Sequence, residues 1–575
     1  MTSNNGISRL WALHAGILIV ALILGVQLFR IQVIKGETYR ELADRQYTVR
    51  TDGGFDRGSI YFTERDGTAL GAGILETGYT IALNPGLIEN PEETFSKLSE
   101  IIILDRNEFL EKALKKDDPY EQIYKRATLA QLEKIKALKL PGVLVEKEKW
   151  RSYPGGRTAS HVLGFVGFKG DTLTGRYGLE AYYNDTLSRG GSTLYSNFFA
   201  QAFSITKSLL EKNGAREGNI VTSIEPSVQG VLETELGELM EKWNSELSGG
   251  IIIDPKTGEI YAMANMPDYD PNVFGKEKSS GVFLNPVVES VYEMGSIMKP
   301  LTVAAGIDTG AITPATTYKD EGFVIVDSSR ISNFDGKGRG VVKMQDILDE
   351  SLNTGAVFVM ERLGKQRFHD YMEKFGFSEE TGIDLLGEVS GSLRNLSDNL
   401  HNKRMVEYAT ASFGQGIAVT PIQMVRALSS LANGGFIVTP HVVNRVEYSV
   451  GFPQEIYPEE GVQVLKQSTS EEVTRMLVHV VDNFLQGGVA KMEHYSIAAK
   501  TGTAQIAHED GGKGYYDDRY LHTFFGYFPA YEPRFLVFLY TKHPKEVRYA
   551  ATTLTSPFVD ITKFLINYYN IPPDR

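Results

Sequence analysis

The sequence predicts an α+β fold for the larger part of this 575-residue chain. A strand at 220–224, a long helix at 226–243 and two strands at 249–254 and 259–264 follow one another closely. The end of the chain adds strands at 496–507, 519–530 and 534–541 and an apolar helix at 558–569. Because the strands adjoin along the chain, we expect an antiparallel sheet flanked by helices.

Composition narrows the class of protein. A hydrophobic content of 42% is typical of a folded globular chain, and the length predicts two or three domains. The net charge of −13 excludes a nucleic-acid partner, which needs a basic face. The chain has no cysteine, which excludes disulfides and thiolate metal sites. The 10 histidines lack metal-ligand spacing, so we expect no metal and no other cofactor.

A membrane anchor is predicted near the start of the chain. Residues 10–29 carry no formal charge, and a helix of that length rises about 30 Å, enough to cross the bilayer. A signal peptide is the alternative, but no A-x-A cleavage site follows the apolar run. We therefore predict a cytoplasmic tail at 1–9 and a transmembrane helix at 10–29. Basic residues on both sides of the run leave its orientation open.

The rest of the chain divides near a polar, glycine-containing stretch at 213–219. Residues 30–215 are predicted to form an N-terminal domain, with charged amphipathic helices at 91–104 and 129–138. The α+β pattern then defines a second domain at 216–575.

One serine–lysine pair lies at the start of an apolar helix in this second domain. Ser296 and Lys299 are three residues apart, so they share one helix face. A serine hydroxyl is a poor nucleophile unless a base takes its proton, and a lysine can do so only when it is neutral. Burial and the positive end of a helix both favour the neutral lysine. A second S-x-x-K, at Ser204 and Lys207, falls before the domain begins.

The K-T-G sequence that accompanies S-x-x-K in serine acyltransferases occurs twice. Residues 256–258 lie where a hairpin must reverse, and turn chemistry explains them. Lys500, Thr501, Gly502 and Thr503 lie in a predicted strand of small residues. There a substrate backbone can lie alongside, and Gly502 permits a close approach. We therefore assign the second copy to the site.

The S-x-N sequence also has two candidates. Ser397-Asp398-Asn399 matches the motif literally but lies in polar sequence. Ser351-Leu352-Asn353 lies between apolar segments, which can hold a catalytic group in place. We therefore assign Ser351 and Asn353 to the site.

With these motifs in this order, the chain resembles the class B penicillin-binding proteins, D,D-transpeptidases of peptidoglycan synthesis. The resemblance includes the anchor, the Arg57-Gly58 segment, the stretch from Tyr153-Pro154 to Glu180, and Phe413-Gly414-Gln415-Gly416. It implies an elongated α/β pedestal (dimerisation-like) domain at 30–215 and a penicillin-binding transpeptidase domain at 216–575. The form Ser351-Leu352-Asn353-Thr354-Gly355 is more similar to the division (septal) branch than to the elongation branch.

The resemblance also implies a role for each site residue. Ser296 is the expected nucleophile and Lys299 its general base, while Ser351 relays protons toward Lys500. Asn353 holds the donor peptide amide, and Lys500, Thr501 and Thr503 bind the terminal carboxylate. The expected ligands are peptidoglycan stem peptides and β-lactam antibiotics. The implied partners are a membrane glycosyltransferase and other division proteins, with the bulk of the chain outside the plasma membrane.

Two other functions are compatible with the same motifs. One is a membrane-tethered β-lactamase or D,D-carboxypeptidase of the same fold, and the other is a catalytically idle division scaffold. The sequence contains no E-x-x-L-N to position a hydrolytic water, so we expect a penicillin adduct to be released slowly.

Overall fold

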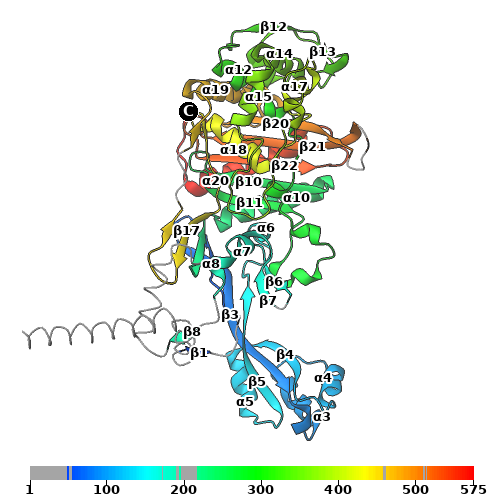
Figure 1. Cartoon of the computed structure of the whole chain (residues 1–575), viewed down its shortest axis with the longest axis vertical. Coiled ribbons are helices and arrows are strands. Elements are labelled where there is room, and N and C mark those ends of the chain that lie inside the picture. The colour runs from blue at the N-terminus through cyan, green and yellow to red at the C-terminus, as the bar shows by residue number, and fades with distance from the viewer. Residues whose placement is uncertain are drawn as a thin grey trace, which may run out of the picture. The chain divides into compact units, whose positions relative to one another are not determined.

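The computed structural model describes residues 48–50, 55–170, 172–189, 193–195, 216–456, 461–508, 512 and 514–575. They form two compact units (Figure 1), of which the larger contains residues 57–76, 151–188 and 217–575 and the smaller is built mainly from Thr77–Trp150. The predicted anchor at 10–29 and the Ser204–Lys207 pair lie outside the described residues. Among the helices within the described ranges, none has the length and apolarity needed to cross a bilayer.

A five-stranded antiparallel sheet forms the centre of the larger unit, as the sequence predicts (Figure 1). Its strands, in spatial order, are β11 (Ile260–Met266), β10 (Leu247–Ile253), β22 (Phe535–Lys542), β21 (Tyr515–Phe528) and β20 (Ala498–Ala507). Among the described strands, β20 pairs only with β21 and therefore lies at the edge of the sheet.

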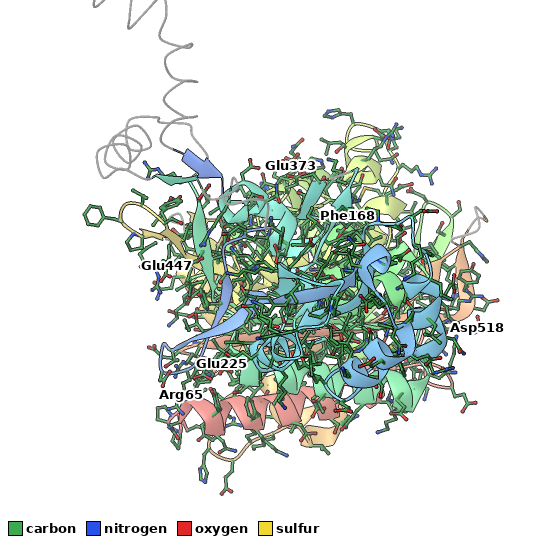
Figure 2. All side chains as sticks on the ribbon, turned by 90° about the horizontal axis from the view of Figure 1, so that it is seen from below. Arg65, Phe168, Glu225, Glu373, Glu447 and Asp518 are labelled. Atoms are coloured by element: carbon green, nitrogen blue, oxygen red, sulfur yellow. The ribbon has the colours of Figure 1, made fainter. Side chains whose placement is uncertain are left out.

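Two helices, α10 (Pro226–Trp243) and α20 (Ala550–Tyr569), cover one face of this sheet. Every second side chain of a strand points to this face. Phe524 of β21 and Val537 of β22 are examples, and they share an apolar cluster with Leu232 of α10 and Phe558 of α20. Arg65 extends this contact, because its guanidinium lies 5.6 Å from the ring centre of Tyr568 (Figure 2).

The opposite face packs against a larger helical layer, which shares one apolar core with the strands. Its helices are α11 (Pro286–Glu289), α12 (Lys299–Asp308), α13 (Met344–Asp349), α14 (Asn353–Leu363), α15 (Lys365–Lys374), α16 (Arg394–Ser397), α17 (Val406–Ala411), α18 (Pro421–Ala432) and α19 (Gln467–Asn483). The same unit contains four short 3-10 turns among the described residues: η3 (Pro271–Lys276), η4 (Ser280–Phe283), η5 (Gly295–Met298) and η6 (Leu485–Gly488). Helix α18 begins with a capping box formed by Thr420 and Gln423.

Short strands complete the larger unit. They are β2 (Ile60–Thr63), β6 (Val166–Lys169), β7 (Thr172–Gly175), β9 (Gly218–Thr222), β12 (Thr317–Asp320), β13 (Phe323–Val326), β14 (Ser329–Ser332), β15 (Gly340–Lys343), β16 (Phe436–Ile437), β17 (Val443–Tyr448), β18 (Gln454–Glu455) and β19 (Val462–Gln463). Around β2 the unit also contains α6 (Ser160–Leu163), α7 (Gly178–Tyr182) and α8 (Asn184–Leu187).

The smaller unit packs three helices against strands. Its elements are the second half of β3 (Ala69–Leu83), η2 (Pro85–Leu87), α3 (Pro91–Ser99), α4 (Arg106–Ala113), β4 (Glu121–Ala127), α5 (Leu129–Ala137) and β5 (Val143–Ser152), with β1 (Thr48–Arg50) paired to β8 (Thr193–Tyr195). The helix predicted at 91–104 ends earlier, at Ser99, and α4 follows it. Asp105 caps α4 by accepting from Glu108 N, so the chain starts a second helix there.

Candidate active site

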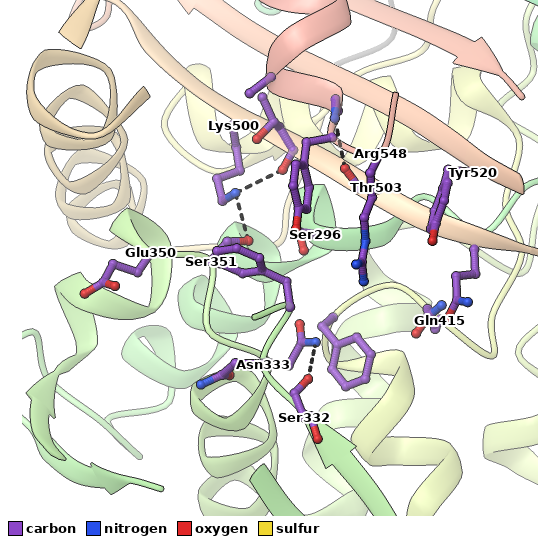
Figure 3. A pocket seen from close by; sticks show the side chains of 18 of the residues that line it. Ser296, Ser332, Asn333, Glu350, Ser351, Gln415, Lys500, Thr503, Tyr520 and Arg548 are labelled. Atoms are coloured by element: carbon purple, nitrogen blue, oxygen red, sulfur yellow. Dashed lines mark hydrogen bonds between the residues drawn. The ribbon is translucent and has the colours of Figure 1, made fainter. Parts of the chain in front are cut away.

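A cavity of about 930 Å³ lies in the larger unit, between the edge of the sheet and the helical layer (Figure 3). It is lined by six of the eight predicted site residues: Ser296, Ser351, Asn353, Lys500, Thr501 and Thr503. The other two, Lys299 and Gly502, lie buried directly behind this lining. The folded chain therefore gathers all three motifs at one place.

Ser296 lies in the 3-10 turn η5, which leads directly into α12. Gly295 precedes it with φ +63, a conformation that favours glycine, and its N–H donates to Gly414 O at 3.0 Å. Pro300 follows in the first turn of α12, where a missing N–H costs little. The turn holds the half-buried Ser296 side chain at the wall of the cavity.

Lys299 is completely buried and points toward Ser351. Its Nζ donates to the Ser351 carbonyl and lies 3.1 Å from Ser351 Oγ. Burial, together with the positive charge of Lys500, holds the pKa of Lys299 well below its ordinary value. No hydrogen bond joins Lys299 to Ser296 among the described residues, so Lys299 lies against Ser351 rather than against the predicted nucleophile.

Ser351 lies between α13 and α14 with φ +54, a left-handed conformation that non-glycine residues seldom adopt. Asn353, two residues later, is the first residue of α14, and its Nδ2 donates to Ser332 O at 2.9 Å. A buried network holds this corner, in which Thr354 Oγ1 donates to Asp320 Oδ1 at 2.8 Å. Sparsely populated backbone conformations held by packed neighbours are frequent at functional sites.

Lys500 reaches the same hydroxyl from β20. Its Nζ donates to Ser351 Oγ at 3.1 Å and to Thr501 O at 2.9 Å. Burial lowers the pKa of Lys500 to about 8, while the Asp349 carboxylate opposes that shift. With a pKa of about 8, Lys500 keeps most of its charge near neutral pH, while burial favours the neutral form of Lys299.

Gly502 faces the turn that holds Ser296. A Cβ at Gly502 would lie 2.3 Å from Thr523 Oγ1 and 2.8 Å from Met294 O. Thr523 Oγ1 also donates to Met294 O at 2.9 Å. The glycine thus allows the sheet to approach the catalytic turn, which is a different reason from the substrate contact that the sequence predicts.

The alternative motif copies within the described residues lie elsewhere. Lys256 N donates to Asp254 Oδ1 at 2.7 Å, and Gly258 has φ +84, so residues 256–258 form the predicted turn. Ser397, in α16, does not line the cavity. Its Oγ lies 2.9 Å from Nε2 of His369.

Several cavity residues were not predicted from the sequence. Two aromatic residues of the lining, Phe334 and Tyr549, have ring centres 5.8 Å apart and lie edge to face. Arg548 and Tyr520 line the cavity beside them. None belongs to a recognisable motif, so only the fold brings them to the site. Phe413 and Gln415 also line the cavity, and the sequence did point to them, because the segment 413–416 is part of the family resemblance.

Ser296 at the cavity wall, with Ser351 nearby in contact with two buried lysines, forms a site equipped for acyl transfer to a serine hydroxyl. Comparisons with known proteins agree with this chemistry. A family model described as "Penicillin binding protein transpeptidase domain" matches residues 249–562, and one described as "Penicillin-binding Protein dimerisation domain" matches residues 56–197.

Curated relatives match over most of the chain. Stage V sporulation protein D of Bacillus subtilis is 30% identical over 551 residues, covering 94% of this chain and 82% of the relative. The peptidoglycan D,D-transpeptidase FtsI of Escherichia coli is 27% identical, covering 76% of this chain and 71% of that protein.

Solved structures share the fold. Penicillin-binding protein 2X of Streptococcus thermophilus superimposes with a TM-score of 0.73 at 21% identity, covering 90% of this chain and 81% of that one. Penicillin-binding protein 3 of Mycobacterium tuberculosis, solved with aztreonam, gives a TM-score of 0.69 at 22% identity, covering 91% and 98%. The transpeptidase family model matches more than half of this chain, and the sporulation protein matches nearly all of it. This chain therefore belongs to the class B penicillin-binding proteins and contains their transpeptidase domain.

Proposed function

We propose that the chain cross-links peptidoglycan stem peptides through an acyl-enzyme on Ser296, with release of D-alanine. The observation that supports this most strongly is the position of Ser351 Oγ, 3.1 Å from Nζ of both Lys299 and Lys500. One hydroxyl between a neutral and a charged lysine can pass a proton from one group to the other.

In the first half of the reaction, Ser296 Oγ attacks the carbonyl carbon of the penultimate D-Ala. Its proton goes to the Lys299 amine, which turns from Ser351 toward Ser296 to accept it, and the backbone N–H groups of Ser296 and Thr503 stabilise the oxyanion. The C–N bond to the terminal D-Ala then breaks. The leaving amine takes the proton from Lys299 through Ser351, and D-alanine departs.

In the second half, an amine of a neighbouring stem peptide attacks the ester carbonyl. Its proton returns to Ser296 Oγ as the C–O bond breaks, which regenerates the serine. If water attacked instead, the product would be a shortened peptide, as in a carboxypeptidase. The absence of an E-x-x-L-N sequence supports slow attack by water on this ester and on a penicilloyl adduct.

The donor peptide is placed along the open edge of β20. Its terminal carboxylate pairs with the charged Lys500 and the hydroxyls of Thr501 and Thr503, and Asn353 holds a peptide amide from the opposite wall. An extended peptide bound in this way adds a strand to the sheet. A carboxylate at Lys500 directs the reacting carbonyl toward Ser296.

The predicted surroundings complete the proposal. Residues 1–9 are the cytoplasmic tail, 10–29 the membrane helix, 30–215 the pedestal and 216–575 the extracytoplasmic catalytic domain; the family matches at 56–197 and 249–562 support this division. The Ser351-Leu352-Asn353-Thr354-Gly355 sequence favours septal synthesis. The proposed partners are a membrane glycosyltransferase and other division proteins.

The test uses the full-length protein in detergent with glycan strands that carry pentapeptide stems. Wild type should release D-alanine and form cross-linked dimers, and Ser296→Ala should do neither. The matched control is Ser397→Ala, whose hydroxyl belongs to the rejected S-D-N sequence. D-alanine release with shortened peptides as the sole product would identify a carboxypeptidase. If wild type forms no product and no covalent penicillin adduct, the chain is a scaffold.

A further inference from the structure

Arg548 offers the cavity a positive charge that the predicted motifs do not include. It lines the cavity just before α20 and is exposed. Within the described residues Arg548 forms no ion pair. Its guanidinium packs against the ring of Tyr549, whose centre lies 5.6 Å away. An arginine held over an aromatic ring with free N–H groups can bind a planar anion such as a carboxylate.

The acidic groups at the cavity wall already have partners. Glu350 accepts from Arg339 Nε at 2.8 Å, and Asp349 Oδ1 lies 3.0 Å from His479 Nδ1. Arg330 stacks on Phe323 of its own hairpin, with 3.6 Å between the guanidinium carbon and the ring centre. Arg330 also forms no ion pair within the described residues, but Arg548 is the wall arginine whose segment is anchored beside Thr503 on β20.

The backbone of Arg548 is anchored to the sheet on two sides. Its carbonyl oxygen lies 3.0 Å from Nε2 of the buried His522, on β21. Two residues later, Ala550 N donates to Thr503 Oγ1 at 3.1 Å, on β20. Figure 3 shows the Arg548 side chain in the cavity, between Ser296 and Tyr520 in this view. A side chain on such a fixed support can discriminate between ligands.

The position along β20 indicates which part of a ligand reaches Arg548. A donor peptide that is antiparallel to β20 has its terminal carboxylate at Lys500 and Thr501 and its reacting carbonyl near Thr503. A strand rises about 3.4 Å per residue, so the residues before the reacting one lie beyond Thr503. Tyr520, its strand partner Gln505 and Arg548 line the cavity on that side, and Arg548 is the charged residue among them.

We propose that Arg548 is a specificity-determining residue that binds a second carboxylate of the donor peptide, upstream of the reacting D-Ala carbonyl. The chain then prefers donors with a free acid at that position over donors in which it is an uncharged amide. This inference rests on the proposed acyl transfer at Ser296. It further specifies that the preferred donor peptide carries a second negative charge.

The test compares two penicillins that differ by one carboxylate on the acyl side chain, benzylpenicillin and α-carboxybenzylpenicillin. The second-order rate constant for acylation is measured with each, and the ratio of the carboxylated to the plain compound is compared between variants. Arg548→Gln should lower this ratio about 10-fold, as expected for the loss of a charge-assisted hydrogen bond. Arg548→Glu should lower it further, and Arg548→Lys should restore part of it.

The matched control is Arg362→Gln. Arg362 is also exposed and stacked on an aromatic ring, that of Phe358 at 5.1 Å, but it lies away from the cavity. Its substitution should leave both rate constants and their ratio unchanged. A ratio that is the same in wild type and Arg548→Gln would overturn the inference. A wild type that neither penicillin acylates would instead overturn the proposed function.

Discussion

The Nζ atom of Lys299 lies 3.1 Å from the hydroxyl oxygen of Ser351, a residue 52 positions further along the chain. Lys500 Nζ lies at the same distance from that oxygen. Two ammonium groups so close to one atom repel each other, and in a buried place water screens them little. This repulsion and burial together favour the neutral form of Lys299, while Lys500, with a pKa of about 8, keeps its charge at neutral pH.

This division predicts a bell-shaped pH dependence for acylation by benzylpenicillin. As pH falls through the lowered pKa of Lys299, the amine gains a proton and can no longer accept one from Ser296. As pH rises through about 8, Lys500 loses its charge and with it the attraction for the carboxylate. Measuring the acylation rate constant as a function of pH tests both limbs of the curve. A rate that keeps rising above pH 8 would show that catalysis does not need the charged form of Lys500.

Asp349 should set the position of the alkaline limb. Its negative charge favours the protonated form of Lys500, so Asp349→Asn removes an effect that raises the Lys500 pKa. The alkaline limb should move to lower pH in this variant. Glu472→Gln is the control, because Glu472 pairs with the surface residue Arg475 at 2.6 Å and should not move the limb. An unmoved limb in Asp349→Asn would show that another group titrates there.

Gly502 should tolerate no side chain. A methyl group there meets Thr523 Oγ1 at 2.3 Å and Met294 O at 2.8 Å, so it pushes the turn with Ser296 away from β20. Gly502→Ala should lose acylation and about 1–3 kcal/mol of unfolding free energy. Gly237→Ala has open space within α10 and should gain a few tenths to about 1 kcal/mol. Thermal unfolding and penicillin acylation on the same samples compare the two, and full activity in Gly502→Ala would contradict this packing.

Glu180 should be needed for the stability of the larger unit. Its buried carboxylate accepts from Arg57 Nε at 2.6 Å and from Arg151 Nε at 2.5 Å. Glu180→Ala would leave two buried guanidinium groups without their partner, and we expect a loss of about 3–5 kcal/mol in urea unfolding. Glu321→Ala removes an exposed carboxylate that pairs with Lys319, and it should cost less than about 1 kcal/mol. Similar losses in both variants would argue against the buried cluster.

The sequence predicted the sheet and its flanking helices because their apolar periods are long and clear. Helix α10 occupies the predicted residues 226–243 in full. The prediction of one helix over 91–104 was wrong at its C-terminal end. Helix α3 ends at Ser99, and Asp105 caps the start of a separate helix, α4. Strand β21 begins at Tyr515, four residues before the predicted start, since pairing with β20 extends it.

For the site, motif order and apolar flanks were sufficient to place Ser296, Ser351 and Lys500 in one cavity. Their mutual contacts could not be predicted, because Lys299 and Ser351 meet only when α12 packs beside α14. The wall formed by Phe334, Arg548 and Tyr549 carries no motif, and Phe334 lies far from the other two in the sequence. Contacts of this kind follow from tertiary packing alone.

The identity of the nucleophile is tested most directly by locating the penicillin adduct. Full-length protein is treated with benzylpenicillin and digested, and the modified residue is identified by tandem mass spectrometry. The adduct is predicted on Ser296, in the peptide that contains Gly295 and Lys299, and it should be absent from Ser296→Ala. An adduct on Ser351 or Ser204, or one that persists in Ser296→Ala, would contradict the account.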